Sequence, residues 1–223
     1  MSEPRPGSVN RKLVGWFVLV GVLIAQGYAG NYADKTKDLN VLYHYSTAIG
    51  SAVVYAIMLG LVLWIAVRRR DLLALRRPST SWLAALGLTV LVFVGAEIAI
   101  QAMDPFLHAG REQGLLPKHW LPKHAGAYAA NWVVVAGIAP FVEELTFRGL
   151  GYSLLAERFG AWTAIGATAL LFAASHGLFQ ALPELAALGA GLAWLRSRID
   201  SIYPGMIVHG VFNSLALSAV FFH

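Results

Sequence analysis

Residues 127–150 read AYAANWVVVAGIAPFVEELTFRGL, an apolar run that ends with two adjacent glutamates, Glu143 and Glu144, and an arginine, Arg148. About 20 apolar residues are enough for a helix to cross a hydrocarbon core about 30 Å thick. Each ionisable side chain inside such a helix costs about 2.5–3.5 kcal/mol on insertion scales, so these groups usually face a protein interior or a water-lined cavity. The run therefore predicts a membrane helix that carries a polar site.

The composition of the whole chain supports a membrane location. Of 223 residues, 57% are hydrophobic and 13% are charged, and the mean hydropathy is +0.60, values typical of integral membrane proteins. The net charge of +5 comes from basic residues beside apolar runs, at positions 68–70, 76 and 77. This placement indicates membrane orientation and no nucleic-acid partner. Cysteine is absent, which excludes disulfides, thiolate metal ligands and a cysteine nucleophile.

The hydropathy pattern predicts an all-α fold, a polytopic membrane helical bundle of about seven spans, with six to eight as the range. The runs lie near residues 13–30, 45–67, 82–103, 127–150, 161–178, 184–196 and 202–222. We expect two parts, with membrane helices and an interfacial loop in residues 1–126 and the polar core in residues 127–223. The distribution of Lys and Arg predicts a cytoplasmic N-terminus, and the composition favours a prokaryotic plasma membrane.

Further polar residues occur in the later apolar runs. If Gly160 marks a turn between two antiparallel helices, Glu144 lies sixteen residues before it and His176 sixteen residues after it. The two side chains would then lie at the same depth. His209 and Asn213 are four residues apart, on one face of a helix.

The spacing also separates the roles of the two glutamates. Glu144 and Arg148 are four residues apart, a pairing that offsets part of the cost of burying each charge. Glu143 has no basic partner in its own helix, so it is the candidate general base, acting on water beside a histidine. A histidine and a carboxamide on a facing helix could donate hydrogen bonds to the oxyanion of a tetrahedral intermediate.

These residues resemble the three ordered motifs of the CPBP family, which includes type II CAAX prenyl endopeptidases and bacteriocin-processing or self-immunity proteins of the ABI group. The motifs are Glu143-Glu144-x-x-x-Arg148, Phe172-x-x-x-His176 and His209-x-x-x-Asn213. The resemblance covers roughly residues 127–222. It implies an intramembrane endopeptidase that cleaves near the cytoplasmic face, in an all-helical fold around a conical cavity.

The resemblance also implies residue roles. Glu143 and His176 would activate water, His209 and Asn213 would stabilise the oxyanion, and Glu144 and Arg148 would hold the site together. The family has been described both as glutamate-type and as metal-dependent proteases. We favour a site with no cofactor, while Glu143, His176 and His209 could alternatively be three ligands of a catalytic Zn²⁺ with water as the fourth.

Two other functions fit the same residues. Intramembrane carboxylates and histidines also relay protons in transporters, and a non-catalytic immunity factor or scaffold could keep the same motifs. A serine protease is disfavoured because the chain lacks a Gly-x-Ser-x-Gly elbow. The expected partners are the lipid bilayer and a peptide or protein substrate that enters from the membrane or the cytoplasmic face. Prenylated and unmodified substrates fit the same motifs.

Overall fold

The computed structural model describes residues 6–32, 38, 40–109, 112, 117 and 119–222, and the regular structure in these ranges is entirely helical. This confirms the predicted all-α fold. The first part contains α1 (Pro6–Tyr32), η1 (Val41–Tyr43), α2 (Tyr45–Ile65), η2 (Arg70–Leu73) and α3 (Trp82–Leu107). An interfacial loop or short amphipathic helix was predicted at residues 104–126. The first residues of this range belong to α3 and the last to η3 and α5, while most of residues 110–118 lies outside the described residues, as does the stretch at 33–37.

The second part begins with one long composite helix. It consists of η3 (Pro122–His124), α5 (Ala125–Val133), the π-helix η4 (Val134–Ile138), α6 (Ala139–Glu144), the π-helix η5 (Leu145–Gly151) and α7 (Tyr152–Phe159). It is followed by α8 (Ala161–Ser175), α9 (Leu182–Ile199), α10 (Tyr203–Ser218) and η6 (Ala219–Phe222).

Five helical stretches within the described residues are long and apolar enough to span a membrane. They are Val9–Tyr32, Tyr45–Ile65, Trp82–Leu107, Pro122–Phe159 and Tyr203–Phe222. A shorter apolar helix, Ala161–Ser175, matches the predicted fifth run. The predicted sixth run forms α9, which includes Glu184, Arg196 and Arg198 and buries much of its surface in the protein. The count is thus roughly that predicted, and α9 is not among the helices apolar enough to be candidate spans.

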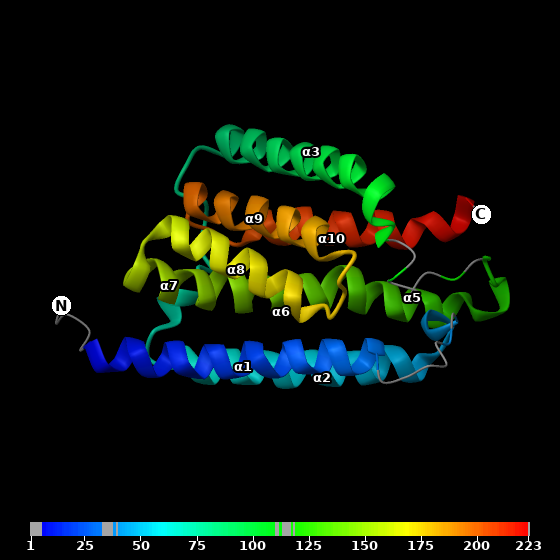
Figure 1. Ribbon diagram of the computed structural model, residues 1–223, viewed down its shortest axis with the longest axis horizontal. Coiled ribbons are helices and arrows are strands. Elements are labelled where there is room, and N and C mark those ends of the chain that lie inside the picture. The colour runs from blue at the N-terminus through cyan, green and yellow to red at the C-terminus, as the bar shows by residue number, and fades with distance from the viewer. Residues whose placement is uncertain are drawn as a thin grey trace.

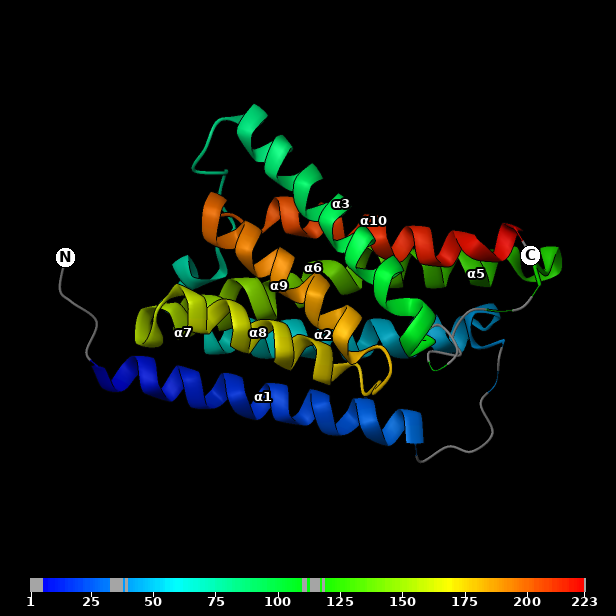
Figure 2. The same ribbon diagram turned by 45° about the horizontal axis from the view of Figure 1, so that its top comes forward.

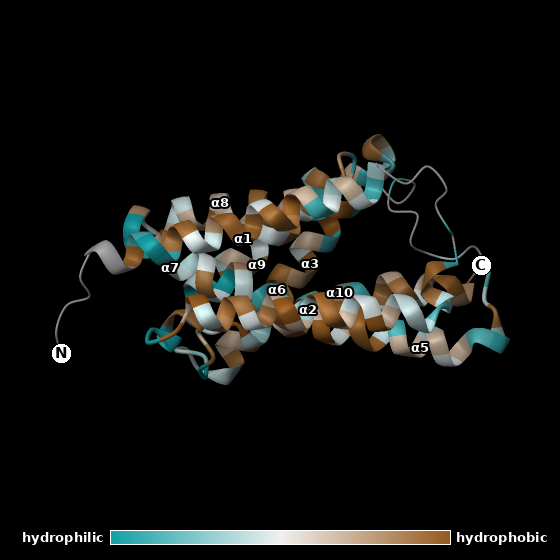
Figure 3. Ribbon diagram, turned by 90° about the horizontal axis from the view of Figure 1, so that it is seen from below, coloured by the Kyte–Doolittle hydropathy of each residue, from teal (hydrophilic) through white to brown (hydrophobic). Residues whose placement is uncertain are grey.

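The helices lie lengthwise beside one another (Figure 1). In two views α1 lies at one edge and α3 at the opposite edge, with α8 and α6 between them (Figures 1 and 2). The main core joins α1, α2, η5, α7 and α8 around Trp16, Phe147 and Phe172, whose side chains are fully buried. Hydrophobic residues run along the helices, while hydrophilic ones gather toward their ends (Figure 3).

The predicted turn at Gly160 is present between α7 and α8, and its φ of +85° is a conformation that glycine adopts easily. This turn lies at the same end of the molecule as the start of α1 and the connections from α2 to α3 and from α9 to α10 (Figure 1). Polar contacts join these segments. Lys12 donates to the carbonyls of Ile65 and Val67, and Arg69 pairs with Glu157 at 2.6 Å.

Candidate active site

A proline shapes the backbone where the composite helix reaches the site. Pro140 has no N–H to donate to the carbonyl of Ala136, and its ring displaces that carbonyl. The preceding segment is the π-helix η4, a form common at functional sites. Helix α10 approaches closely here, since a Cβ added at Gly210 would lie 2.8 Å from the Ala136 oxygen. A glycine at position 210 therefore allows α10 to bring its polar residues to α6.

The pairing predicted from the spacing of Glu144 and Arg148 is present. Arg148 Nη1 lies 3.0 Å from Glu144 Oε1, and both side chains are fully buried. Arg148 also donates to the carbonyl of Gly189 in α9 at 3.1 Å and lies 4.3 Å from the ring centre of Phe172. A buried charge is costly without partners, and the partners of Arg148 include residues of α8 and α9. This arginine therefore connects η5 to both helices.

Glu143 lies on the neighbouring face and is partly accessible, with its side chain 13% exposed. The hydroxyl of Tyr55, in α2, donates to Glu143 Oε1 at 2.7 Å. The other carboxylate oxygen, Oε2, lies 3.7 Å from His209 Nε2. Glu143 is thus held by one donor from the N-terminal part of the chain and faces an imidazole from α10.

His209 lies between the two carboxylates. Its Nδ1 is 3.2 Å from Glu144 Oε1, and the side chain is almost completely buried. A carboxylate beside Nδ1 favours the tautomer with the proton on that nitrogen. Within the described residues, His209 is the histidine that contacts both Glu143 and Glu144.

His176 is the C-cap residue of α8 and is held from two sides. Its Nδ1 lies 2.8 Å from the carbonyl oxygen of Phe172, so an Nδ1–H donated there leaves the lone pair on Nε2. Its own carbonyl accepts from the side-chain amide of Asn31, in α1, at 2.9 Å. Helix α1 also packs directly on this segment, because a Cβ added at Gly27 would lie 2.5 Å from the Ser175 oxygen.

Asn213 lies one turn after His209 in α10. Its Nδ2 donates to the carbonyl of Val135 in η4 at 2.8 Å. A carboxamide nitrogen has two N–H groups, so this bond fixes the side chain and uses only one of them.

Phe172 connects the two histidines. Its ring centre lies 4.7 Å from that of His176 and 5.5 Å from that of His209, edge to face in both cases. Direct contacts therefore join Glu143, Glu144, Arg148 and His209, whereas His176 joins the cluster through Phe172. Tyr55 and Asn31 also hold the site, and sequence reasoning missed both because no local spacing relates them to the motifs.

The zinc alternative requires three ligands that converge on one point. Among the residues that the structure describes, no three His, Asp or Glu side chains are grouped closely enough to hold a metal ion. Glu143 and His209 approach each other, but His176 is held against Phe172. The three residues therefore do not form a preassembled zinc site.

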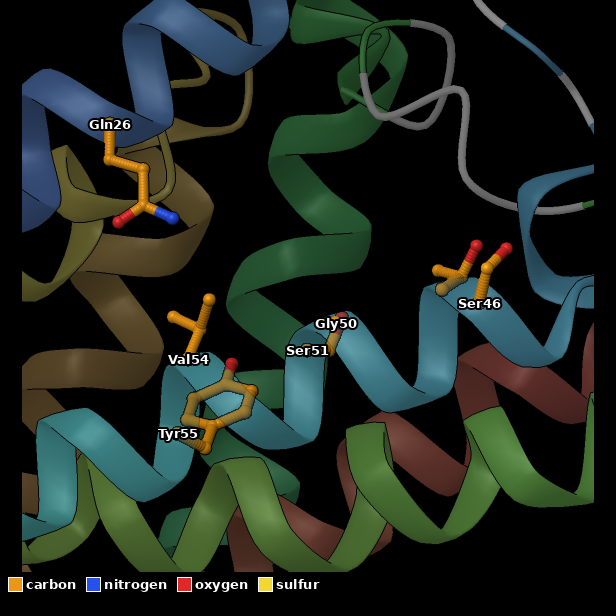
Figure 4. Close-up of a pocket in the computed structure, with 7 residues that line it drawn as sticks. Gln26, Ser46, Gly50, Ser51, Val54 and Tyr55 are labelled. Atoms are coloured by element: carbon orange, nitrogen blue, oxygen red, sulfur yellow. The ribbon is translucent and has the colours of Figure 1, made fainter.

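A groove opens beside Tyr55. It lies between α1 and α2, has a volume of about 450 Å³, and is lined by residues that include Gln26, Ser46, Thr47, Gly50, Ser51 and Tyr55. We call it the α1–α2 groove. Figure 4 shows Gln26 extending from α1 toward the part of α2 that carries Val54 and Tyr55.

Comparison with known proteins adds one finding. Residues 125–215 match the family model described as Type II CAAX prenyl endopeptidase Rce1-like. No curated protein and no solved structure matches the chain. The match includes all three motifs and confirms the resemblance inferred from them.

Proposed function

With a Type II CAAX prenyl endopeptidase Rce1-like segment at residues 125–215, we propose that this protein is an intramembrane endopeptidase with Glu143 as its general base. The family match supports an endopeptidase in general. One observation carries the residue assignment. Glu143 is a partly accessible carboxylate whose Oε1 accepts from Tyr55 while Oε2 faces His209. Glu144, in contrast, is fully buried and is paired with Arg148.

The proposed reaction is direct hydrolysis. A water molecule at Glu143 Oε2 transfers a proton to the carboxylate as its oxygen attacks the carbonyl carbon of the scissile bond. The lone pair on His176 Nε2 accepts a hydrogen bond from the same water and orients it. The Glu143 carboxyl then delivers the proton to the amide nitrogen, and the C–N bond breaks to give a carboxylic acid and an amine. Transfer of the remaining proton of the attacking water from the acid to the amine gives the released carboxylate and ammonium.

The oxyanion of the intermediate would be stabilised from α10. His209 would donate through Nε2 when that nitrogen carries a proton, while Glu144 Oε1 holds the other ring nitrogen, Nδ1. Asn213 donates through the N–H that Val135 does not accept. Donors placed before the reaction need no reorganisation when charge develops, and this makes such arrangements effective.

The substrate is a peptide or protein segment that reaches the site from the bilayer or from the membrane surface, and we propose cleavage near the cytoplasmic face. In keeping with the cluster geometry, we propose a glutamate-type site without a metal. Metal analysis of the purified active protein tests this choice. We expect less than about 0.1 equivalent of zinc and unchanged cleavage after chelator treatment, since a structural or catalytic zinc would be bound stoichiometrically. Stoichiometric zinc with chelator-sensitive cleavage would contradict it.

Proton transport is the competing function, because carboxylates and histidines inside a membrane also serve as relays. A single preparation distinguishes proton transport from peptide hydrolysis. Protein reconstituted in vesicles is assayed for hydrolysis of a panel of unmodified and farnesylated peptides and for proton flux under an imposed pH gradient. We expect hydrolysis of at least one peptide and no flux above empty vesicles. Flux without hydrolysis would favour transport.

A further inference from the structure

The α1–α2 groove places neutral polar groups in a membrane region. Helix α2 is one of the most apolar stretches of the chain, yet Ser46, Thr47 and Ser51 all lie on its groove-facing side. Gln26 adds a carboxamide from α1. Polar side chains on spanning helices usually face a protein interior, another helix or a water-lined cavity. These groups therefore mark a face that serves something other than lipid packing.

One lining residue of the groove also contacts the proposed active site. Tyr55 lines it, and the same tyrosine hydroxyl donates to Glu143 at 2.7 Å. An occupant of the groove is thus separated from the proposed general base by a single side chain. Such a site can hold the residues that flank a reacting bond.

The hydrogen-bonding groups that line the groove indicate which class of ligand fits it. Hydroxyl and carboxamide groups both donate and accept hydrogen bonds, which matches the alternating N–H and C=O groups of an extended peptide. None of the groove-lining residues that the structure describes is charged, so a phosphate headgroup would find no cationic partner. An acyl or prenyl chain would leave the polar groups without hydrogen bonds, at a cost.

We infer that the α1–α2 groove binds an unmodified, extended segment of the peptide substrate through its backbone and delivers the adjoining bond to Glu143. This inference rests on the proposed endopeptidase function. It assigns substrate binding to the N-terminal helices, which lie outside the segment that matches the family model.

The groove can be filled without disturbing the packing of α2. A Cβ added at Gly50 meets nothing within 4 Å, and the same holds for Gly60, which lies on the same helix but does not line the groove. We expect Gly50→Leu to raise KM for an unmodified peptide by about tenfold or more and to change kcat by less than about twofold, the pattern of lost substrate binding. Gly60→Leu should behave as wild type. An unchanged KM in Gly50→Leu would overturn the inference.

A second experiment measures binding without catalysis. The chain has no cysteine, so Ser51→Cys introduces a single thiol in the groove and Gly60→Cys a single thiol outside it. Both are made in a Glu143→Gln background and labelled with a maleimide, which reacts with the thiolate. The probe is a pool of cysteine-free decapeptides of randomised sequence. We expect the pool to slow labelling of Ser51→Cys about threefold or more, a ratio that measures occupancy, and to leave Gly60→Cys unaffected.

The two experiments separate the groove from the function. If peptides protect Ser51→Cys but the wild type hydrolyses none of them, the endopeptidase proposal fails and the groove stands as a peptide-binding site. If hydrolysis depends on Glu143 but Ser51→Cys is not protected and Gly50→Leu is unimpaired, the groove inference fails alone. Protection by dihexanoylphosphatidylglycerol and not by peptides would identify a lipid site and would also overturn it.

Discussion

Arg148 is a fully buried cation of the site and depends on several partners for its charge. Its guanidinium is fully buried, pairs with Glu144, donates to Gly189 and lies over Phe172. The pair need not be a net source of stability, because taking two charges out of water is costly. Removing one member, however, leaves the other charge without compensation. Arg148 therefore supports the site by making the burial of Glu144 and the placement of His209 possible.

This role predicts a stability effect for Arg148→Met. Glu144 would be left buried without its cation, so we expect the unfolding free energy to fall by about 3–5 kcal/mol. Arg158→Met is the matched control, since Arg158 is exposed at the end of α7. The measurement is unfolding in mild detergent, followed by intrinsic fluorescence. Equal stability of the two variants would show that the buried pair is not required.

Asn213 gives a kinetic prediction. Because its carboxamide is held by Val135 and offers one further N–H, Asn213→Ala should remove a donor to the oxyanion. We expect kcat to fall by about 10²-fold, as for other oxyanion donors, with little change in KM. The test is steady-state cleavage of a fluorogenic peptide. A rise in KM with unchanged kcat would place Asn213 in substrate binding instead.

At the scale of elements, α1 positions the His176 segment. Gly27 allows the two backbones to approach, and Asn31 donates to the carbonyl of His176. The segment after His176 is itself constrained, since Gly177 has a φ of +67° and a Cβ there would lie 2.2 Å from the carbonyl carbon of Gly27. The first helix thus packs directly against the segment that carries His176.

Gly27→Ala tests this contact. The added methyl group would lie 2.5 Å from the Ser175 oxygen, so α1 or the His176 segment must move. Displacement of a catalytic group by about 1 Å can reduce a rate by about 10²-fold, and we expect cleavage to fall by at least about tenfold. Gly21→Ala is the control in the same helix, because a Cβ there meets nothing within 4 Å. Equal activities would exclude a positioning role for α1.

The features that sequence reasoning predicted well are local ones. The pairing of Glu144 with Arg148 follows from a spacing of four residues, and the turn at Gly160 follows from glycine's conformational range. Tyr55 could not be found in this way, since it lies 88 residues from Glu143 in the chain. The depth argument placed Glu144 level with His176, but depth along a helix does not fix lateral neighbours. Within the described residues it is His209 that contacts both carboxylates.

At the scale of the whole molecule, Glu112 links the two parts of the chain through hydrogen bonds. Its carboxylate accepts from Tyr32 at the end of α1 and from the backbone N–H groups of Phe179, Gln180 and Ala181, which directly precede α9. Burial raises the pKa of Glu112, but these hydrogen bonds outweigh that effect and hold its pKa below the ordinary value of 4.5.

A pH dependence of stability follows from the depressed pKa. Folding favours the charged form of the Glu112 carboxyl. Its contribution to the free energy of unfolding is therefore complete above about pH 4.5 and is lost as the pH falls through the lower pKa of the folded state. We expect Glu112→Gln to lower the unfolding temperature at pH 7, and the difference from wild type to shrink on acidification below about pH 4.5. Thermal unfolding at a series of pH values measures this. A difference that stays constant with pH would contradict the assignment.

The most direct test of the proposed hydrolytic site is the kcat of Glu143→Gln on a peptide that the wild type cleaves. Glutamine keeps the shape and a hydrogen-bonding oxygen near Tyr55 but cannot accept the proton of water. We predict a fall of at least about 10²-fold, the contribution of a general base, with unchanged unfolding temperature and with full activity in the control Glu97→Gln, whose carboxylate lies in α3. Cleavage by Glu143→Gln at the wild-type rate would contradict the account.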